Sequence, residues 1–206
     1  EVSVEIVVYK GEVHILAVTD KSTLGKPYFV EIGHAEQSQK STETVAAIKD
    51  LAIRAVKVVG IDNSPAHVEI MVTKDGPKMV ELGSRMGGGC ITTHLVPLST
   101  GIDMIKSVMD LALGLEPDLE PKLDKGSALR HIVGIEGVIE SIEGLDEARQ
   151  VPGVFEVTML KNVGEECHYF KNGADRIGYV IAQGKDTAEA IAICEEAIKK
   201  INIKTK

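Results

Sequence analysis

The chain opens with the alternation of side chains that is typical of β-strands. Residues 2–8 carry valine or isoleucine at every even position, and a second strand-like stretch covers residues 13–20. Successive side chains of a strand point to opposite faces, so a period of two predicts strands. Lys10-Gly11-Glu12 separates the two stretches as a turn. We predict a hairpin over residues 2–20 and a third short strand at 28–32.

The first predicted strand begins at the first residues of the chain, without a preceding cap or polar segment. A chain that starts inside a strand is typical of an excised piece. We therefore expect residue 1 to be a boundary within a longer protein.

Helical periodicity appears next, because apolar residues between 45 and 59 recur at steps of three and four. Ser41 or Thr42 can cap the start of this helix, and Gly60 can end it. Strands are predicted at 67–73 and 78–83.

A second helix is predicted from about residue 101 to 113. Thr100 and Asp103 have the spacing of a capping box at its start, and Gly114 follows its end.

Residues 115–127 contain two prolines and several charges without an apolar period, so we predict a linker there. The division is then a first domain at 1–114 and a second at 128–206. In the second half the pattern predicts strands at 129–135, 138–142, 154–160 and 177–182, and helices at 145–150 and 186–201. Both halves mix strands and helices without strict alternation, which predicts the α+β class.

Charge and cysteine content exclude several classes of function. The net charge of −8 repels phosphate backbones, and few aromatic residues are available to stack on bases, so nucleic acid is an unfavourable partner. No apolar stretch approaches the length of a membrane span. Cys90, Cys167 and Cys194 are odd in number and lack CxxC spacing, which argues against disulfides and structural zinc. We expect a cytoplasmic protein.

The predicted hairpin of residues 67–83 places two acids opposite each other. With Lys74-Asp75-Gly76 as a three-residue loop, Thr73 pairs with Pro77 and Glu69 faces Glu81. Like charges directly opposed on one sheet face are destabilising.

A compensating cation is therefore expected beside the two acids. Mg²⁺ with oxygen ligands is one solution, and a raised pKa on one Glu or pairing with Arg85 are the others. Strand periodicity puts Glu81, Gly83 and Arg85 on the same face. A metal beside arginine suits phosphoryl transfer, whereas a solvated ladder of surface charges is the plain structural alternative.

The run Gly87-Gly88-Gly89 follows Arg85 closely. Without side chains its backbone N–H groups can approach an anionic ligand, although a flexible turn has the same composition. It matches neither a Walker loop nor a dinucleotide fingerprint.

Together these segments resemble the C-terminal half of the ATP-grasp fold. The resemblance rests on Glu1–Glu5, on residues 15–21, on the strand of Glu69, and on the stretch from Glu81 to Gly89. It is most similar to carboxylate–amine ligases of the L-amino-acid ligase and carbamoyl-phosphate-synthase-like group. Residues 126–206 resemble the accessory domain of the same ligases.

The resemblance implies roles for individual residues. In that family two acids on adjacent strands hold Mg²⁺ bound to ATP, which implies metal binding by Glu69 and Glu81, where Mn²⁺ can replace Mg²⁺. Arg85 matches the arginine that stabilises an acyl-phosphate intermediate, and Lys21 matches a lysine near the terminal phosphate. A surface lysine at a strand end is the alternative for Lys21.

This sequence departs from the pattern of the family at two points. Gly83 stands where most members have Asn, so a second metal loses a ligand. The family's ATP lysines, phosphate loop and adenine hinge lie upstream of the part that matches Glu1. We therefore expect the isolated chain to bind ATP weakly and to turn nothing over.

Five further residues are candidates for substrate contact. Glu5 shares a face of the first strand with Ser3, where it can orient Lys21 or substrate, or be merely solvated. The glycine run 87–89 and His94 after it can border the substrate.

Two functions from different classes remain open. The first is part of an ATP- and Mg²⁺-dependent ligase that joins a small carboxylate, such as an amino acid, to an amine through an acyl phosphate. The second is a binding module of the same fold that has lost catalysis and senses a nucleotide or amino acid. Sheet surface left uncovered by the absent half leaves room for a homo-oligomer.

Overall fold

The computed structural model describes all 206 residues and divides them into two compact units. Unit 1 consists of Glu1–Asp20 and Glu36–Lys125, and unit 2 of Lys21–Ala35 and Gly126–Lys206. The sequence-based division placed residues 21–35 in the first domain, whereas here they cluster with the second. No helix has both the length and the apolar character needed to cross a bilayer.

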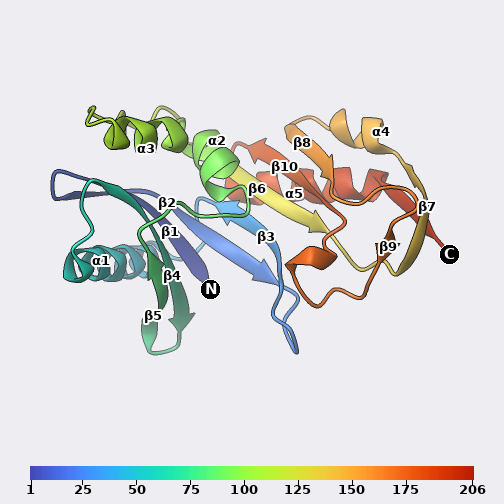
Figure 1. Ribbon diagram of the computed structural model, residues 1–206, viewed down its shortest axis with the longest axis horizontal. Coiled ribbons are helices and arrows are strands. Elements are labelled where there is room, and N and C mark those ends of the chain that lie inside the picture. Colours follow the sequence, from blue (N-terminus) through green and yellow to red (C-terminus); the bar gives the residue numbers. More distant parts are fainter. The chain divides into compact units, whose positions relative to one another are not determined.

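Unit 1 is built on antiparallel strands in the order β5-β4-β1-β2 (Figure 1). The strands are β1 Val2–Tyr9, β2 Glu12–Thr23, β4 Ser64–Thr73 and β5 Gly76–Gly83, and β2 passes into unit 2 after Asp20. The predicted opening hairpin and the 67–83 hairpin are both confirmed.

Helix α1, Thr42–Val59, covers one face of these strands (Figure 1). Its buried residues Ile48, Ala52 and Val56 pack against the even-numbered aliphatic side chains of β1 and against β4. Ser41 accepts a hydrogen bond from the Thr44 N–H, and Gly60 ends the helix with a φ of 79°. Both predicted caps are therefore correct.

The segment after β5 is more helical than the sequence predicted. A π-helical turn η1, Ile91–Leu95, and helix α2, Val96–Thr100, precede helix α3, Met104–Ala112. The capping box at Thr100 is wrong, because the carboxylate of Asp103 caps α3 by accepting from the Lys106 N–H.

The β4–β5 hairpin pairs Glu69 with Glu81 as predicted, but by a different route. Thr73 pairs with Gly76, so the turn is one residue shorter than the predicted loop. A bulge between Glu69 and Ile70 then shifts the register by one residue. The two departures cancel at the acid pair.

Unit 2 contains a sheet segment in the order β3-β6-β10-β8 and a three-stranded sheet in the order β11-β7-β9. Its strands are β3 Glu31–Glu36, of which Glu36 belongs to unit 1, β6 Gly126–Ile132, β7 Gly137–Glu143, β8 Val154–Met159, β9 Glu166–Cys167, β10 Gly178–Gly184 and β11 Asn202–Thr205. Its helices are α4 Leu145–Arg149, the 3₁₀ turn η2 Gly173–Asp175 and α5 Thr187–Lys200.

The third strand was predicted too early in the chain. Residues 28–30 belong to a loop, in which the amide of Leu24 donates to the carbonyl of Val30, and β3 starts only at Glu31. Strands β9 and β11 were not predicted, because each is too short to show a period. The α+β class, with antiparallel strands and covering helices, is confirmed.

Helix α5 forms the core of unit 2 with the strands beneath it. Ala190, Cys194 and Ala197 are fully buried against Val180 and other aliphatic side chains of β6, β8 and β10, and the predicted apolar stripe lies there. Asp186 caps the helix by accepting from the Glu189 N–H.

We predict that Ala197→Asp destabilises the chain by about 3 kcal/mol, because a buried carboxylate without a partner loses its hydration. Ala192→Asp is the matched control, since Ala192 is exposed on the same helix. Thermal unfolding followed by circular dichroism measures both. Equal melting temperatures for the two variants would contradict the packing described for α5.

A carboxyl group is buried in unit 1 at Glu36. Thr19 Oγ1 donates to Glu36 Oε1 at 2.6 Å, and Ser99 Oγ lies 3.0 Å from Oε2. Ser99 Oγ also lies 3.3 Å from the Val96 carbonyl, although it has one proton to donate. Both contacts of Ser99 can be hydrogen bonds if Glu36 is protonated, because Glu36 then donates to Ser99 and Ser99 donates to the Val96 carbonyl.

Burial raises the pKa of Glu36 to about 8, and the nearby charge of Glu5 acts in the same direction. The hydroxyl groups of Thr19 and Ser99 oppose the shift only partly. Glu36 is therefore largely protonated at neutral pH. Because its folded-state pKa lies above the unfolded one, the unfolded chain loses this proton first, and stability falls as pH rises from about 4.5 to about 8.

We predict that Glu36→Gln flattens the fall in unfolding free energy between pH 5 and 8, which otherwise contributes on the order of 1.4 kcal/mol per pH unit. Glutamine keeps an acceptor for Thr19 and a donor for Ser99 but does not titrate. Urea titrations at several pH values measure the slope, with exposed Glu12→Gln as the control. An unchanged slope in Glu36→Gln would refute a protonated Glu36.

Candidate functional site

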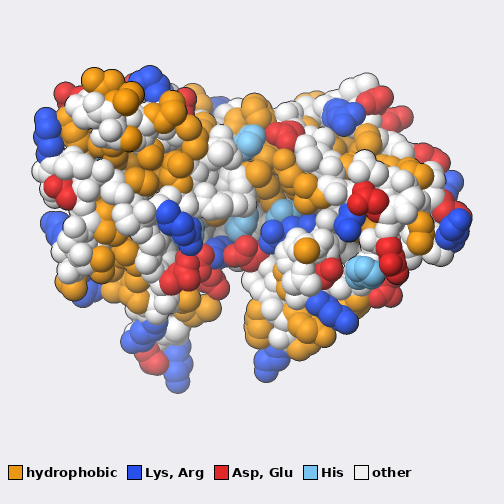
Figure 2. Space-filling model, viewed as in Figure 1, with side chains coloured by type: hydrophobic (Ala, Val, Ile, Leu, Met, Phe, Trp, Pro, Cys, Tyr) orange, Lys and Arg blue, Asp and Glu red, His pale blue; other side chains and the backbone are white.

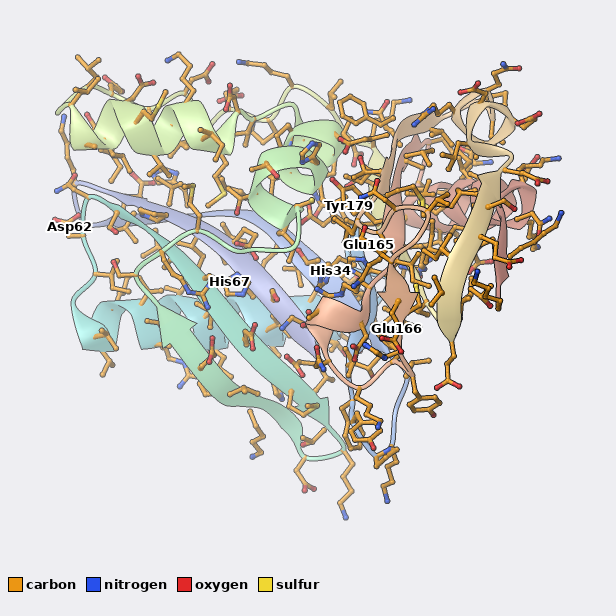
Figure 3. The ribbon with its side chains drawn as sticks, turned by 45° about the vertical axis from the view of Figure 1, so that its right-hand side comes forward. His34, Asp62, His67, Glu165, Glu166 and Tyr179 are labelled. Carbon is orange, nitrogen blue, oxygen red and sulfur yellow. The ribbon has the colours of Figure 1, made fainter.

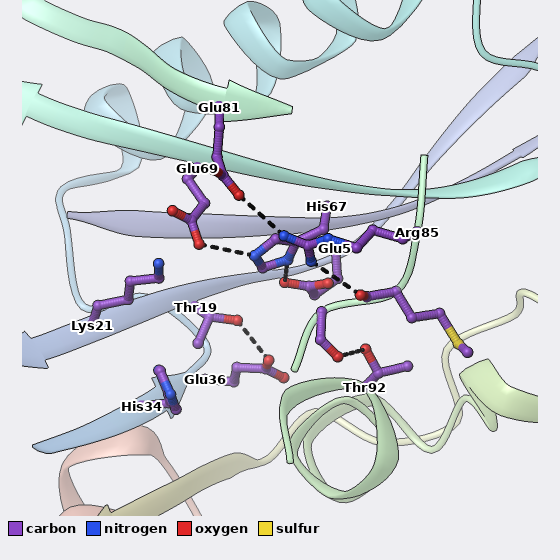
Figure 4. A network of polar contacts seen from close by, with 12 residues as sticks. Glu5, Thr19, Lys21, His34, Glu36, His67, Glu69, Glu81, Arg85 and Thr92 are labelled. Atoms are coloured by element: carbon purple, nitrogen blue, oxygen red, sulfur yellow. Dashed lines mark hydrogen bonds and ion pairs between the residues drawn. The ribbon is translucent and has the colours of Figure 1, made fainter. Parts of the chain in front are cut away.

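A histidine lies between two carboxylates on the face of unit 1 opposite α1. His67 Nδ1 is 2.7 Å from Glu5 Oε1, and His67 Nε2 is 3.2 Å from Glu69 Oε1 (Figure 4). The strand register produces this arrangement, because Glu5 on β1 pairs directly with His67 on β4 (Figure 3). Glu69 follows two residues later on the same face.

His67 is best described as an imidazolium. A neutral imidazole has one N–H, whereas both ring nitrogens here face carboxylate oxygens. Burial alone would lower the pKa of His67, but the hydrogen bonds and charges of Glu5 and then Glu69 outweigh it and raise the pKa. The charge of His67 therefore compensates the fully buried Glu5 and orients Glu69.

Arg85 provides the positive charge beside Glu81. Its Nη2 donates to Glu81 Oε1 at 3.0 Å, and about half of each side chain is exposed. Acidic side chains gather over β4 beside basic ones on the face drawn in Figure 2. The opposed acids are thus compensated by His67 and Arg85, and the pairing with Arg85 is one of the alternatives to a metal ion that the sequence offered.

The glycine positions around this site have specific packing reasons. A Cβ at Gly87 would lie 2.7 Å from Glu5 Oε2 and 2.8 Å from His67 Nδ1, so only glycine fits over this pair. A Cβ at Gly83 would come within 3.1 Å of the Arg85 side chain. Gly83 therefore gives Arg85 room to turn back toward Glu81.

The remaining candidates have other local environments. Gly88 has open space around it, Gly89 has a φ of 58°, and His94 Nδ1 is 2.7 Å from Thr93 Oγ1 on η1. Lys21 belongs to unit 2, where its nearly buried ammonium pairs with Glu31 at 3.1 Å. The alternative interpretation of Lys21, an exposed lysine at a strand end, therefore does not apply. Roles in substrate or nucleotide binding stay predictions for these residues.

Glu69 and Glu81 can serve as part of a metal site but not as a complete one. The structure contains no group of three or more His, Cys, Asp or Glu side chains placed to hold a metal ion. Of the two carboxylate oxygens of Glu81, Oε1 accepts the hydrogen bond from Arg85. Carboxylate oxygens are ligands that Mg²⁺ prefers. Mg²⁺ at nucleotide sites typically takes one or two carboxylates and completes its shell with phosphate oxygens and water. The donor set fits that pattern.

Sequence reasoning missed His67 and Glu36. His67 could have been found, because His67 and Glu69 share a strand face at a spacing of two. Glu36 could not, since its burial depends on Thr19 and Ser99, which lie far from it in the sequence.

Two family descriptions match most of the chain. Residues 1–94 match the ATP-grasp domain, and residues 131–206 match the L-amino acid ligase C-terminal domain 2. Among curated proteins, y4rH of Sinorhizobium fredii is 27% identical over 154 residues, which is 74% of this chain and 32% of that protein. Human carnosine synthase 1 is 27% identical over 135 residues, covering 66% of this chain and 16% of that protein.

Solved structures agree with these matches. The L-amino acid ligase from Bacillus licheniformis aligns with a TM-score of 0.89 at 27% identity, covering 100% of this chain and 54% of that chain. Phosphoribosylglycinamide synthetase from Anaerococcus prevotii aligns with a TM-score of 0.88 at 22% identity, covering 100% of this chain and 53% of that chain. A 2-oxoglutarate carboxylase domain from Hydrogenobacter thermophilus, solved with MgADP and bicarbonate, aligns at a TM-score of 0.70 and 18% identity, covering 98% of this chain and 45% of that chain.

The chain thus spans about half the length of the solved structures and a third or less of the curated relatives. Its two parts match an ATP-grasp domain and the domain that follows it in L-amino acid ligases. The chain is therefore similar to ATP-grasp ligases over both of its parts.

Proposed function

We propose that this chain is part of an ATP- and Mg²⁺-dependent ligase that forms an amide or peptide bond through an acyl phosphate. ATP would phosphorylate a small carboxylate, and an amine would then attack the acyl carbon and release phosphate. The direct pairing of Glu69 with Glu81, with Arg85 four residues later, carries this proposal. Amino acids are the substrate class favoured by the match of residues 131–206.

Arg85 is assigned to the charge that develops on phosphate oxygens. Its ion pair with Glu81 is half exposed, and pairs of this kind contribute little to stability, so the guanidinium can change partners at small cost. Preorganised positive groups beside developing phosphate charge account for much of the catalysis in phosphoryl transfer.

Glu69 and Glu81 are assigned to the metal ion that accompanies ATP. When bound, Mg²⁺ would neutralise phosphate charge and orient the terminal phosphate. His67 acts behind Glu69, because it holds Glu69 Oε1 at 3.2 Å and so fixes the carboxylate on the face it shares with Glu81. His67 is in this sense a positioning residue.

The alternative is a binding module of the same fold without catalysis. A module that only binds would not require the arginine beside the acid pair, and the ligase is therefore the better proposal. The chain spans about half the length of the solved ligases, so we expect turnover from a protein of that full length and not from these 206 residues alone.

We predict that Glu81→Gln and Arg85→Gln in the full-length protein each lower kcat for Mg²⁺-dependent ADP formation by about a hundredfold or more. Arg54→Gln is the matched control, because Arg54 forms an exposed pair with Asp50 at the same i,i+4 spacing. All three should leave the unfolding free energy within about 1 kcal/mol of the unchanged protein.

Turnover retained within about threefold in both site variants would contradict the assignment, since removal of one preorganised charge should cost far more. A full-length protein that binds ATP but forms no ADP with any amino acid would favour the binding module instead.

A further inference from the structure

Unit 2 contains a pocket of about 280 Å³, and every residue that lines it belongs to this unit. Residues of β3, β6 and α5 line it, and these elements can be followed in Figure 1. Ile32, Val133 and Ile198 provide aliphatic walls, and most of the lining is apolar. A volume near 300 Å³ suits a small molecule.

Arg130 in this pocket is a half-buried guanidinium without a carboxylate partner. Its Nη1 donates only to main-chain carbonyls, at 3.1 Å to Leu129 and 3.4 Å to His34. Burial lowers the pKa of Arg130, and the charge of Glu195 opposes this only in part. A half-buried guanidinium that makes no ion pair is unfavourable, so this group is suited to accept an anion.

The backbone makes room for Arg130. A Cβ at Gly33 on β3 would lie 2.5 Å from Arg130 Nη1 and 2.9 Å from its Cδ. The φ of Gly33 is not in the left-handed region, so its backbone does not itself require glycine. The carbonyl oxygen of Leu129 would also lie 2.5 Å from that Cβ, so both the β6 backbone and the Arg130 side chain exclude a larger residue here.

The other polar residues of the lining leave a net positive charge. Lys199 and Glu195 lie on α5, so the charged lining consists of two cations and one acid. His131 also lines the pocket, and neither of its ring nitrogens has a hydrogen-bond partner. Burial, followed by the charges of Arg176 and His34, lowers the pKa of His131 to about 3, so the ring is neutral.

We propose that this pocket binds a small aliphatic monocarboxylate, whose carboxylate pairs with Arg130 and whose tail packs against Ile32, Val133 and Ile198. A guanidinium presents parallel N–H groups that match a planar carboxylate. The single net positive charge suits a monoanion better than a phosphate dianion. The apolar walls require a tail, which distinguishes the ligand from a bare anion.

This site does not depend on the proposed ligase chemistry, because it uses no residue assigned to the metal, the nucleotide or the reacting groups. Binding at the pocket can therefore be measured on the 206-residue chain without ATP.

The test is a titration of the ¹⁵N-labelled chain with isovalerate at constant ionic strength, followed by amide chemical shifts. We expect saturable shifts at 130–133 and 195–199 with a Kd of about 1 to 10 mM, ordinary for so small a ligand. Isovaleramide has the same shape without the charge, and acetate has the charge without the tail. Both should bind at least about tenfold more weakly, a difference of about 1.4 kcal/mol.

Arg130→Gln should weaken isovalerate binding by at least about tenfold. Arg149→Gln is the control, since Arg149 forms an exposed ion pair with Asp146 on α4 of the same unit. If Arg130→Gln fails to fold, the comparison of isovalerate with isovaleramide on the unchanged chain decides.

Equal shifts from isovalerate and isovaleramide would overturn the proposal, as would unchanged affinity in a folded Arg130→Gln variant. Inorganic phosphate that binds as tightly as isovalerate would overturn the ligand class.

Discussion

The arrangement of unit 1 depends on the charge of His67 between Glu5 and Glu69. Glu5 is fully buried, and an uncompensated carboxylate in that position would cost several kcal/mol. The imidazolium removes this penalty, and Gly87 can then pack directly over the pair. It also fixes Glu69 on the face that Glu81 shares. The buried ion pair of Glu5 and His67 thereby fixes the position of Glu69 in the more exposed site beside it.

The helices and strands were predictable where the hydrophobic pattern repeats over many residues. The alternation of β1 and the stripes of α1 and α5 are local signals that tertiary packing reinforces. The start of β3 was not predictable, because the 24–30 loop carries apolar residues that mimic a strand. The bulge next to Glu69 was also missed, since it compensates a turn whose length the sequence leaves open.

The site was predictable only as far as its strand register. Glu69, Glu81 and Arg85 could be placed on one face from spacing alone, and the structure brings Arg85 to Glu81. Sequence spacing could not show that His67 would compensate the charge of Glu5, because their contact joins strands that lie far apart in the chain. Long-range pairing of β1 with β4 determines that contact.

The charge state of His67 is the most direct test of this account. Two-dimensional NMR of the ¹⁵N-labelled imidazole rings reports whether both nitrogens carry protons. We predict that the pKa of His67 lies above that of free histidine and that Glu5→Gln lowers this pKa. A pKa of His67 at or below that of free histidine in the unchanged protein would contradict the claim that His67 compensates Glu5 and positions Glu69.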